Sequence, residues 1–324
     1  MEPLSRDEVG VVFEFIAADL ERIEGVLTEA STAGTPFLTE TAAYLTKAGG
    51  KRLRPALVAL ASRLWSGCGP RADATAAAIE LTHLATLYHD DVIDEADVRR
   101  GVPTANDKWG NTVAILVGDF LFARASSIAA DVGGEVPRVL ADAIARVVQG
   151  QVRELEHLYD ARRPTAHYFS TVDDKTGALL EASARLGAVL GGSPPEQAEQ
   201  LRSFGSSFGF AFQIADDLLD FSASQEDLGK APGTDVRVGV YTLPLLYALE
   251  ADASVEALLG TPTPDVDAIR DAVVRTGAFE RSLAVAADHV DKALAALERT
   301  PPGPARDSLE RLSHLVIERV PVLE

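Results

Sequence analysis

Two short acidic segments repeat one pattern in distant parts of the chain. Residues 89–94 read HDDVID and residues 216–220 read DDLLD, so each contains Asp-Asp-x-x-Asp. On a helix, residues four apart share a face, which would place Asp90 beside Asp94 and Asp216 beside Asp220. The chain has 26 Asp among 324 residues, so the pattern is expected roughly 0.2 times by chance. Two copies therefore indicate a shared chemical role.

A solvated acidic helix end is the simplest alternative for either motif alone. Like charges at four-residue spacing destabilise a helix, and a helix C-terminus disfavours anions. Such carboxylates favour a bound cation. Mg²⁺ prefers hard oxygen ligands and is commonly held by one or two carboxylates together with substrate phosphates. Two facing carboxylate clusters would suit a diphosphate between them.

Basic residues that could bind a diphosphate occur near the first motif. Residues 49–55 read GGKRLRP, which puts Lys51 and Arg54 three apart, and Arg99 and Arg100 follow the first motif directly. Arg presents a planar fork to phosphate oxygens and Lys a point charge. Lys is scarce here, with six Lys against 24 Arg. A Gly-Gly-Lys-Arg run alone is a surface loop about two times in three. It indicates a diphosphate site only in combination with the acidic motifs.

The elements that must position these residues are helices. Apolar residues recur at three- and four-residue spacing, and Gly- and Pro-rich breaks separate the runs. Alternating β-type segments with regular hairpin turns are missing from the pattern. We predict an all-α fold of roughly ten or more helices in a single domain over residues 1–324. The expected helices are Glu8–Leu27, Ala56–Leu64, Ala72–Val92, Val113–Ala130, Val136–Leu158, Leu179–Leu190 and Pro195–Phe221.

Bulk properties exclude several classes of protein. The net charge of −19 argues against a nucleic-acid partner, which would need clustered Lys and Arg. No stretch approaches the ~18 apolar residues of a membrane span. The first ten residues lack a signal-peptide pattern. The single Cys68, which cannot form an intramolecular disulfide, has no acidic or His partner in the sequence pattern and is expected to be inert. These features predict a cytoplasmic protein.

The ordered motifs resemble one known family, the trans-type polyprenyl diphosphate synthases. The resemblance runs from about Gly49 to Leu249, which is most of the chain. It implies an isoprenoid-synthase helical bundle around a central active-site cavity. It also implies a Mg²⁺-dependent prenyltransferase that condenses isopentenyl diphosphate with an allylic diphosphate, with three metal ions when substrate is bound.

The same resemblance implies roles for individual residues. The metal ligands would be Asp90, Asp94, Asp216 and Asp220, with Asp91 and Asp217 in support. The pocket for isopentenyl diphosphate would consist of Lys51, Arg54, His83 and Arg100. The allylic diphosphate would be held by Arg99, Lys175 and Lys230. The developing carbocation would face the polar groups of Thr176 and Gln213, which together with Lys175 would be the catalytic residues.

Three of these residues have plain alternatives. A lone His in an apolar helix, such as His83, is more often a core residue than a ligand, and Lys175 and Lys230 could be surface lysines. The sequence also departs from the family pattern at Val240, where many members have Lys. This removes one expected cation from the allylic diphosphate site.

Product length should depend on the residues before Asp90. In the family, an aromatic residue five or four places earlier closes the floor of the product tunnel. Here those places hold Ala85 and Thr86, so we predict a product longer than geranylgeranyl diphosphate, of the kind used for a quinone side chain. The alternative is a shorter product, if Tyr88, Phe120 or Phe122 closes the tunnel instead.

Other readings remain open at this stage. A class I terpene cyclase also uses Asp-rich helices, but it needs no pocket for isopentenyl diphosphate. A non-catalytic partner subunit or a divalent-ion-binding helical protein would be free to lose motif residues. The resemblance implies a homodimer, although some long-chain members require a dissimilar second subunit, and Glu8–Leu27 or Asp307–Val320 could pack at an interface. A long apolar product suggests transient contact with a membrane.

Overall fold

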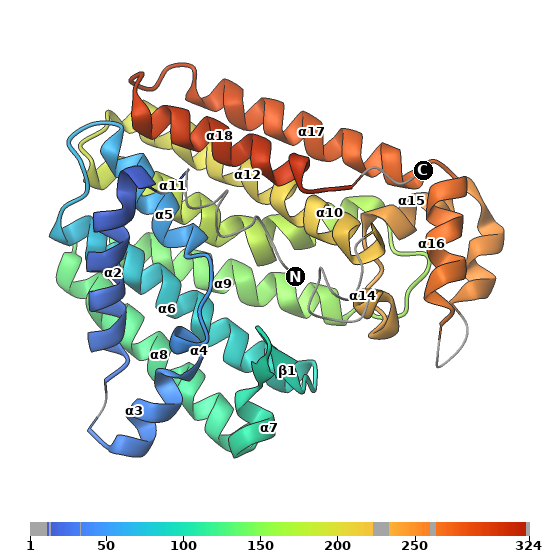
Figure 1. Cartoon of the computed structure of the whole chain (residues 1–324), viewed down its shortest axis with the longest axis horizontal. Coiled ribbons are helices and arrows are strands. Elements are labelled where there is room, and N and C mark those ends of the chain that lie inside the picture. The colour runs from blue at the N-terminus through green and yellow to red at the C-terminus, as the bar shows by residue number, and fades with distance from the viewer. Residues whose placement is uncertain (1–11, 13, 33, 223–232, 260–263, 322–324) are drawn as a thin grey trace.

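A computed structural model describes residues 12, 14–32, 34–222, 233–259 and 264–321 (Figure 1). Within these ranges nearly all regular structure is helical, and the only sheet described is a hairpin of two short strands, Val98–Arg99 and Val102–Pro103. The prediction of an all-α fold is confirmed. The helices are η1 Glu14–Ile16, α2 Ala17–Ala30, α3 Pro36–Ala42, α4 Tyr44–Lys47, α5 Leu53–Arg63, α6 Pro70–Ile93, α7 Ala105–Trp109, α8 Asn111–Val132, α9 Val136–Leu155, α10 Thr165–Val172, η2 Asp173–Gly177, α11 Ala178–Leu190, α12 Pro195–Ser222, α14 Thr234–Arg237, α15 Leu243–Ala251, η3 Ala253–Leu258, α16 Val266–Arg275, α17 Ala278–Leu297 and α18 Pro304–Glu318.

Two long helices carry the acidic motifs. Helix α6 begins with Pro70 after an extended Gly69, where a proline is pre-set for the first turn, and ends at Asp94, which caps it. Helix α12 also begins with a proline and runs for 28 residues. α6 packs against α5, α8 and α2, while α12 packs against α11 and α17. Helices α5 and α11 lie between the two, so both motifs end at the interior of the bundle (Figure 1).

The predicted helices match the observed ones with shifts of a few residues at their ends. The first prediction is the exception, since Glu8–Leu27 begins outside the described residues and the regular α-helix there, α2, begins at Ala17. The region expected at Asp307–Val320 forms α18. The short helices α3, α4, α7 and α10 were not predicted, because four to eight residues are too few to show a helical period.

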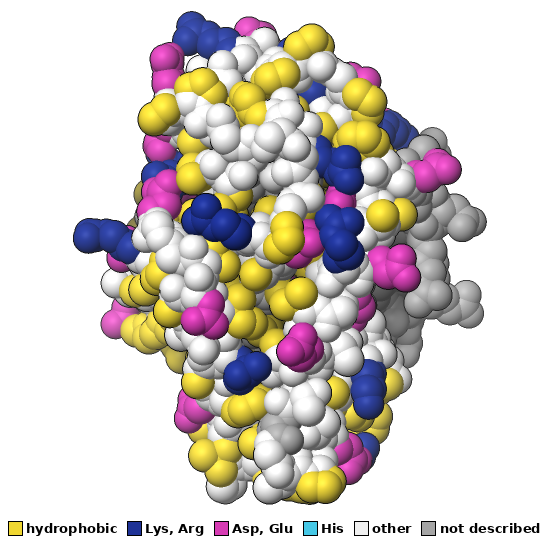
Figure 2. All heavy atoms as spheres, turned by 90° about the vertical axis from the view of Figure 1, so that its left-hand side faces the viewer, with side chains coloured by type: hydrophobic (Ala, Val, Ile, Leu, Met, Phe, Trp, Pro, Cys, Tyr) yellow, Lys and Arg dark blue, Asp and Glu magenta, His cyan; other side chains and the backbone are white. Residues whose placement is uncertain are grey.

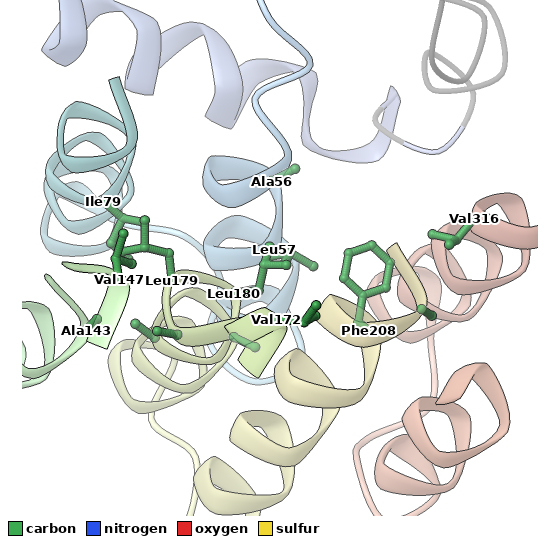
Figure 3. Close-up of a cluster of buried hydrophobic side chains, with 14 of the residues drawn as sticks. Ala56, Leu57, Ile79, Ala143, Val147, Val172, Leu179, Leu180, Phe208 and Val316 are labelled. Atoms are coloured by element: carbon green, nitrogen blue, oxygen red, sulfur yellow. The ribbon is translucent and has the colours of Figure 1, made fainter. Parts of the chain in front are cut away.

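Small residues let the central helices approach closely. Buried Ala56, Val147 and Val172 come from three helices, α5, α9 and α10, and Figure 3 shows them in one cluster with larger side chains such as Leu180. Each fully buried Val or Leu contributes about 1.5–3 kcal/mol by leaving water. The core is therefore rigid enough to hold polar groups at fixed positions beside it.

One described helix, α8, is long and apolar enough to cross a membrane. By length and composition alone this is weak evidence, because core helices of soluble proteins pass the same test. At the end of the molecule where α2 lies, basic and acidic side chains are interspersed among hydrophobic ones (Figure 2).

Candidate active site

The first acidic motif closes helix α6. Asp90 and Asp91 lie in its last turn, and the backbone N–H of Asp94 donates to the Asp90 carbonyl oxygen. Asp91 is fully buried and accepts a hydrogen bond from Arg99 Nε. Burial raises the pKa of Asp90 to about 6, with Lys175 opposing and Asp94 adding to the rise. The hairpin therefore engages the middle carboxylate through Oδ1, whereas Asp91 Oδ2 is buried without a partner among the described residues.

Arg54, His83 and Arg100 form a basic cluster beside α6. Burial lowers the pKa of His83 well below its usual value, and the guanidinium groups of Arg54 and Arg100 lower it further. The imidazole is therefore neutral at physiological pH. Arg54 Nε is buried without a hydrogen-bond partner among the described residues. This cluster is suited to an anion with several oxygens.

A glycine makes this cluster possible. Arg100 donates through Nη1 to the carbonyl oxygen of Gly49. A Cβ atom on Gly50 would lie 2.9 Å from the same nitrogen, and the φ of Gly50 is +151°. Only glycine suits both conditions. The Gly-Gly pair before Lys51 therefore wraps the backbone around the Arg100 guanidinium.

Lys51 interacts with a different pair of residues, Arg319 and Asp216. Asp216 is the first residue of the second acidic motif. Lys51 Nζ, Asp216 Oδ1 and Arg319 Nη1 are all buried, and none of the three has a hydrogen-bond partner in the part of the chain that the structure describes. Burial lowers the pKa of Lys51 to about 7, with Arg319 adding to the fall and Asp216 opposing it. Burial also lowers the pKa of Arg319, and Asp216 opposes this shift. These charged ends converge without bonding to one another, as expected of groups that await a ligand.

Arg319 follows the last turn of α18 and is anchored from both sides. Its Nε donates to the Val316 carbonyl oxygen, and its Nη2 donates to the Phe212 carbonyl oxygen at 3.3 Å. The guanidinium lies 4.9 Å from the centre of the Phe212 ring, within range of a cation–π contact. The C-terminal helix thereby delivers a fixed cation to the second motif.

The middle aspartate of the second motif is also fully engaged. Asp217 is buried, its Oδ2 accepts from the Tyr168 hydroxyl, and its Oδ1 accepts from Gln213 Nε2 at 2.9 Å. Gln213 Oε1 in turn accepts from Thr176 Oγ1 at 2.7 Å. Burial raises the pKa of Asp217 well above its usual value, and the nearby Asp235 raises it further. Both oxygens of Asp217 are thus engaged by side chains of the protein.

Lys175 and Thr176 lie on η2, a single π-helical turn between α10 and α11. Lys175 Nζ forms an ion pair with Glu154 Oε1 at 2.5 Å. Burial lowers the pKa of Lys175, but Glu154, Asp90 and Asp94 together raise it above its usual value. A Cβ on Gly150 of α9 would lie 2.6 Å from the Lys175 backbone nitrogen. This glycine therefore lets the π turn press against α9, beside the first motif.

Two other residues singled out from the sequence, Asp220 and Val240, contact the backbone of Asp235. Asp220 is buried, and its Oδ2 accepts from the Asp235 backbone N–H at 3.3 Å. Lys230 lies outside the described residues. Val240 is half-buried, and its backbone N–H donates to the Asp235 carbonyl oxygen.

Comparison with known proteins identifies the family. Residues 35–275 match the family model described as polyprenyl synthetase. The chain belongs to the polyprenyl synthetase family. It is therefore an enzyme, a transferase of prenyl groups, which confirms the predicted reaction class.

Relatives of the chain match it over nearly its whole length. Nonaprenyl diphosphate synthase of Mycobacterium tuberculosis is 40% identical over 316 residues, covering 94% of this chain and 93% of the relative. Heptaprenyl diphosphate synthase component 2 of Geobacillus stearothermophilus is 40% identical over 314 residues, covering 95% and 98%. The crystal structure of a polyprenyl synthase from Caulobacter crescentus, complexed with calcium and isoprenyl diphosphate, has a TM-score of 0.91 at 35% identity, covering 97% of this chain and 98% of that one.

The residues expected to set product length lie on α6 and α8 and differ in their surroundings. Ala85 is fully buried and Thr86 half-buried, on the helix that ends at Asp90. Tyr88 is directed elsewhere, because its hydroxyl donates to the Thr41 carbonyl oxygen in α3. Phe122 lies beside His89, with ring centres 5.7 Å apart. Tyr88 is thus removed from the candidate tunnel floors.

The carboxylates of this polyprenyl synthetase do not form a metal site by themselves. Among the described residues, no three His, Cys, Asp or Glu side chains lie close enough together to hold an ion. Two surface grooves, of about 320 and 360 Å³, are lined by none of the motif residues. Neither groove therefore marks the predicted site, and a metal ion held by the motif carboxylates would need further oxygen ligands from a bound substrate.

Three residues of this polyprenyl synthetase site escaped the sequence analysis: Glu154, Tyr168 and Arg319. Glu154 lies at the end of an apolar helical run, where a charged residue is usually solvated, so nothing in the sequence singled it out. Tyr168 precedes Lys175 by seven residues, two helical turns, and this spacing was an available signal. Arg319 lies beyond the stretch that carried the resemblance, so no local pattern linked it to the motifs.

Proposed function

We propose that this prenyltransferase condenses isopentenyl diphosphate with farnesyl or geranylgeranyl diphosphate to make a long-chain polyprenyl diphosphate for a quinone side chain. The observation that supports the proposal is that Lys51, Asp216 and Arg319 each have a buried polar atom without a partner among the described residues and interact electrostatically with one another. A diphosphate with its metal ions is the kind of ligand that satisfies both cations and a carboxylate at once.

The donor set fits divalent metal ions, and we propose Mg²⁺, with three ions when substrate is bound. Asp90 and Asp94 on one side and Asp216 on the other offer hard carboxylate oxygens, with Asp220 adjoining. The raised pKa of Asp90 is that of a buried carboxylate lacking its cation. The Caulobacter relative was crystallised with calcium and isoprenyl diphosphate. Bound metal would stabilise negative charge on the leaving diphosphate.

Separate groups of residues would bind the two substrates. Arg54, His83 and Arg100 would hold the diphosphate of isopentenyl diphosphate, with Lys51 and Arg319 at the border of the second motif. Arg99, Lys175 and Lys230 would hold the allylic diphosphate. Because Arg99 and Lys175 are already paired with Asp91 and Glu154, each is held in place before substrate arrives.

Ionisation of the allylic C–O bond would follow from this charge placement. Fixed cations stabilise the developing negative charge without reorganising at the moment of reaction. The allylic cation would form beside the oxygens of Thr176 and Gln213, and the double bond of isopentenyl diphosphate would attack it. A proton then leaves to the departing diphosphate, so no side-chain nucleophile is needed. The buried surroundings protect the cation from water.

The small residues before Asp90 support a long product. Neither Ala85 nor Thr86 can block a chain that grows along α6 toward its N-terminus. The next bulky cluster on the way, formed by Ile79, Val147 and Leu179 from three helices, is shown in Figure 3. Ile79 precedes Asp90 by eleven residues, about 16 Å along the helix axis. The curated relatives named above make nonaprenyl and heptaprenyl products.

We further propose a single-domain, cytoplasmic homodimer that contacts a membrane transiently to release its product. Helices α8 and α9 pack together and expose a shared apolar face consisting of Ile115, Leu116, Val148, Val152 and Leu155. Exposed apolar side chains clustered in this way mark an interaction surface. A second copy of the same face would cover it by isologous packing.

Incubation of the purified protein with Mg²⁺, isopentenyl diphosphate and each allylic starter in turn tests the proposal, with products measured by mass spectrometry. We expect chains longer than geranylgeranyl from the farnesyl and geranylgeranyl starters. Products no longer than geranylgeranyl diphosphate would support the proposed reaction but refute the proposed product length. If no starter gives product, the chain depends on a second subunit, as the name of the heptaprenyl component 2 relative suggests for that protein.

A further inference from the structure

A continuous hydrogen-bonded series joins α10, α12 and the π turn. The Tyr168 hydroxyl donates to Asp217 Oδ2 at 2.5 Å, and Gln213 Nε2 donates to Asp217 Oδ1 at 2.9 Å. Thr176 Oγ1 then donates to Gln213 Oε1 at 2.7 Å. Tyr168 and Asp217 are buried and Thr176 is 9% exposed. The series therefore runs from the interior to the surface of the site beside Lys175.

The direction of these bonds decides which atoms face the site. A side-chain amide has nearly the same shape at both ends but opposite hydrogen-bonding character. Because Asp217 accepts from the nitrogen of Gln213, the amide oxygen is fixed on the Thr176 side. The Thr176 hydroxyl uses its only hydrogen on that oxygen, so its own oxygen retains lone pairs alone for other directions.

We propose that Tyr168 and Asp217 are positioning residues that hold Gln213 and Thr176 with oxygen lone pairs, rather than hydrogens, toward the allylic cation. This inference rests on the proposed function of Thr176 and Gln213. Without the Asp217 carboxylate, the amide could turn over and place N–H groups beside a positive centre. Tyr168 prevents this indirectly, because its hydroxyl fixes the rotamer of the buried carboxylate.

The same geometry separates the two halves of the second motif. Both oxygens of Asp217 are used within the protein, whereas Asp216 Oδ1 has no partner in the described chain. Asp217 therefore orients a dipole, and Asp216 is the residue left to bind metal. Loss of the Asp217 charge should leave metal affinity intact, and loss of the Asp216 charge should not.

Tyr168→Phe is the primary test, because it removes one hydroxyl and preserves the ring. Tyr88→Phe is the matched control: Tyr88 is equally buried, and its hydroxyl donates to a backbone carbonyl at 2.5 Å. We expect Tyr168→Phe to lower kcat on the order of tenfold, as for the loss of one buried hydrogen bond. KM for both diphosphates should stay within about twofold, and melting temperatures should match the control. A kcat equal to that of the control would overturn the proposal.

A double-mutant cycle asks whether Tyr168 acts through Gln213. In a Gln213→Leu background, we expect Tyr168→Phe to have almost no further effect on kcat, because the group it positions is already gone. An equal loss in both backgrounds would mean that Tyr168 acts by another route and would refute the inference. Product formation by the wild-type enzyme establishes the proposed reaction independently of either result.

Asp217→Asn provides a second variant if Tyr168→Phe folds poorly. We expect a similar loss in kcat with the half-saturating Mg²⁺ concentration unchanged within about twofold, while Asp216→Asn should raise that concentration on the order of tenfold. A comparable rise for Asp217→Asn would show that this carboxylate binds metal and would overturn its assignment as a positioning residue.

Discussion

At the scale of single residues, the free protein carries charges that lack their counterpart. Lys51 is the clearest case, because burial lowers its pKa to about 7 and Arg319 adds to the effect. An unfolded lysine has a pKa near 10.4, so the folded chain binds fewer protons than the unfolded chain between pH 7 and about 10. The free energy of unfolding therefore rises with pH across that window, and the destabilisation due to Lys51 builds up as pH falls from about 10 to 7 and is complete below pH 7.

Binding of isopentenyl diphosphate should reverse this shift, because an anion favours the ammonium form. At pH 8 we expect uptake of nearly one proton per ligand through Lys51, and little uptake at pH 6. Calorimetry in buffers of different ionisation enthalpy measures the number of protons. Lys51→Met supplies the control for protons taken up by the ligand itself. Equal uptake by the wild type and Lys51→Met would contradict the assignment.

The two acidic motifs show what sequence reasoning could and could not resolve at this scale. Spacing predicted correctly that Asp90 and Asp94 end a helix together. It could not reveal that Asp91 and Asp217 are both engaged by partners within the protein, Arg99 and Tyr168. Those partners come from a hairpin and a short helix whose positions depend on the tertiary fold.

At the scale of elements, the long helices were predictable and the irregular ones were not. Apolar periodicity located α6 and α12 within a few residues, because their length gives the period many repeats. The π turn at Asp173–Gly177 has no such signature, since one extra residue in a helical run leaves the composition unchanged. It is nonetheless the element that carries Lys175 and Thr176, and it is accommodated by Gly150 on α9.

Helix α6 also carries the length prediction. Ala85→Phe and Thr86→Phe should each shift the product distribution to shorter chains, because an aromatic ring there fills the path along the helix. Ala85 is fully buried, so we expect this variant also to lose about 1–3 kcal/mol of stability by overpacking. Mass spectrometry of products and thermal melting measure the two effects.

Ala251→Phe, at an exposed residue at the end of α15, is the control for adding an aromatic ring. It should leave the product distribution unchanged. If the wild type and both α6 variants make the same products, the open floor is not what sets their length.

At the scale of the whole molecule, we expect the exposed apolar face of α8 and α9 to bind a second copy of the chain. Leu116 is 59% exposed and Val152 49% exposed. Leu116→Glu or Val152→Glu would bury an unpaired charge in a self-complementary interface, which costs several kcal/mol. We expect the dimer dissociation constant to rise at least about 100-fold, measured by analytical ultracentrifugation.

Phe15→Glu, at an exposed apolar residue on η1, which packs against α2 and α5, would test a similar change outside the face. A wild-type protein that sediments as a monomer would argue against the homodimer. A dimer unaffected by both α8 and α9 variants would place the interface elsewhere.

The meeting of Lys51 and Arg319 has a consequence for how the molecule opens. These cations come from α5's leading loop and from the end of α18, far apart along the chain, and α18 packs against α5 and α12. A bound anion that both cations contact would link the loop before α5 to the end of α18. This link would lower the frequency with which α18 detaches by local unfolding. Hydrogen exchange in α18 would then slow when substrate binds, although most of the helix lies away from the reacting atoms.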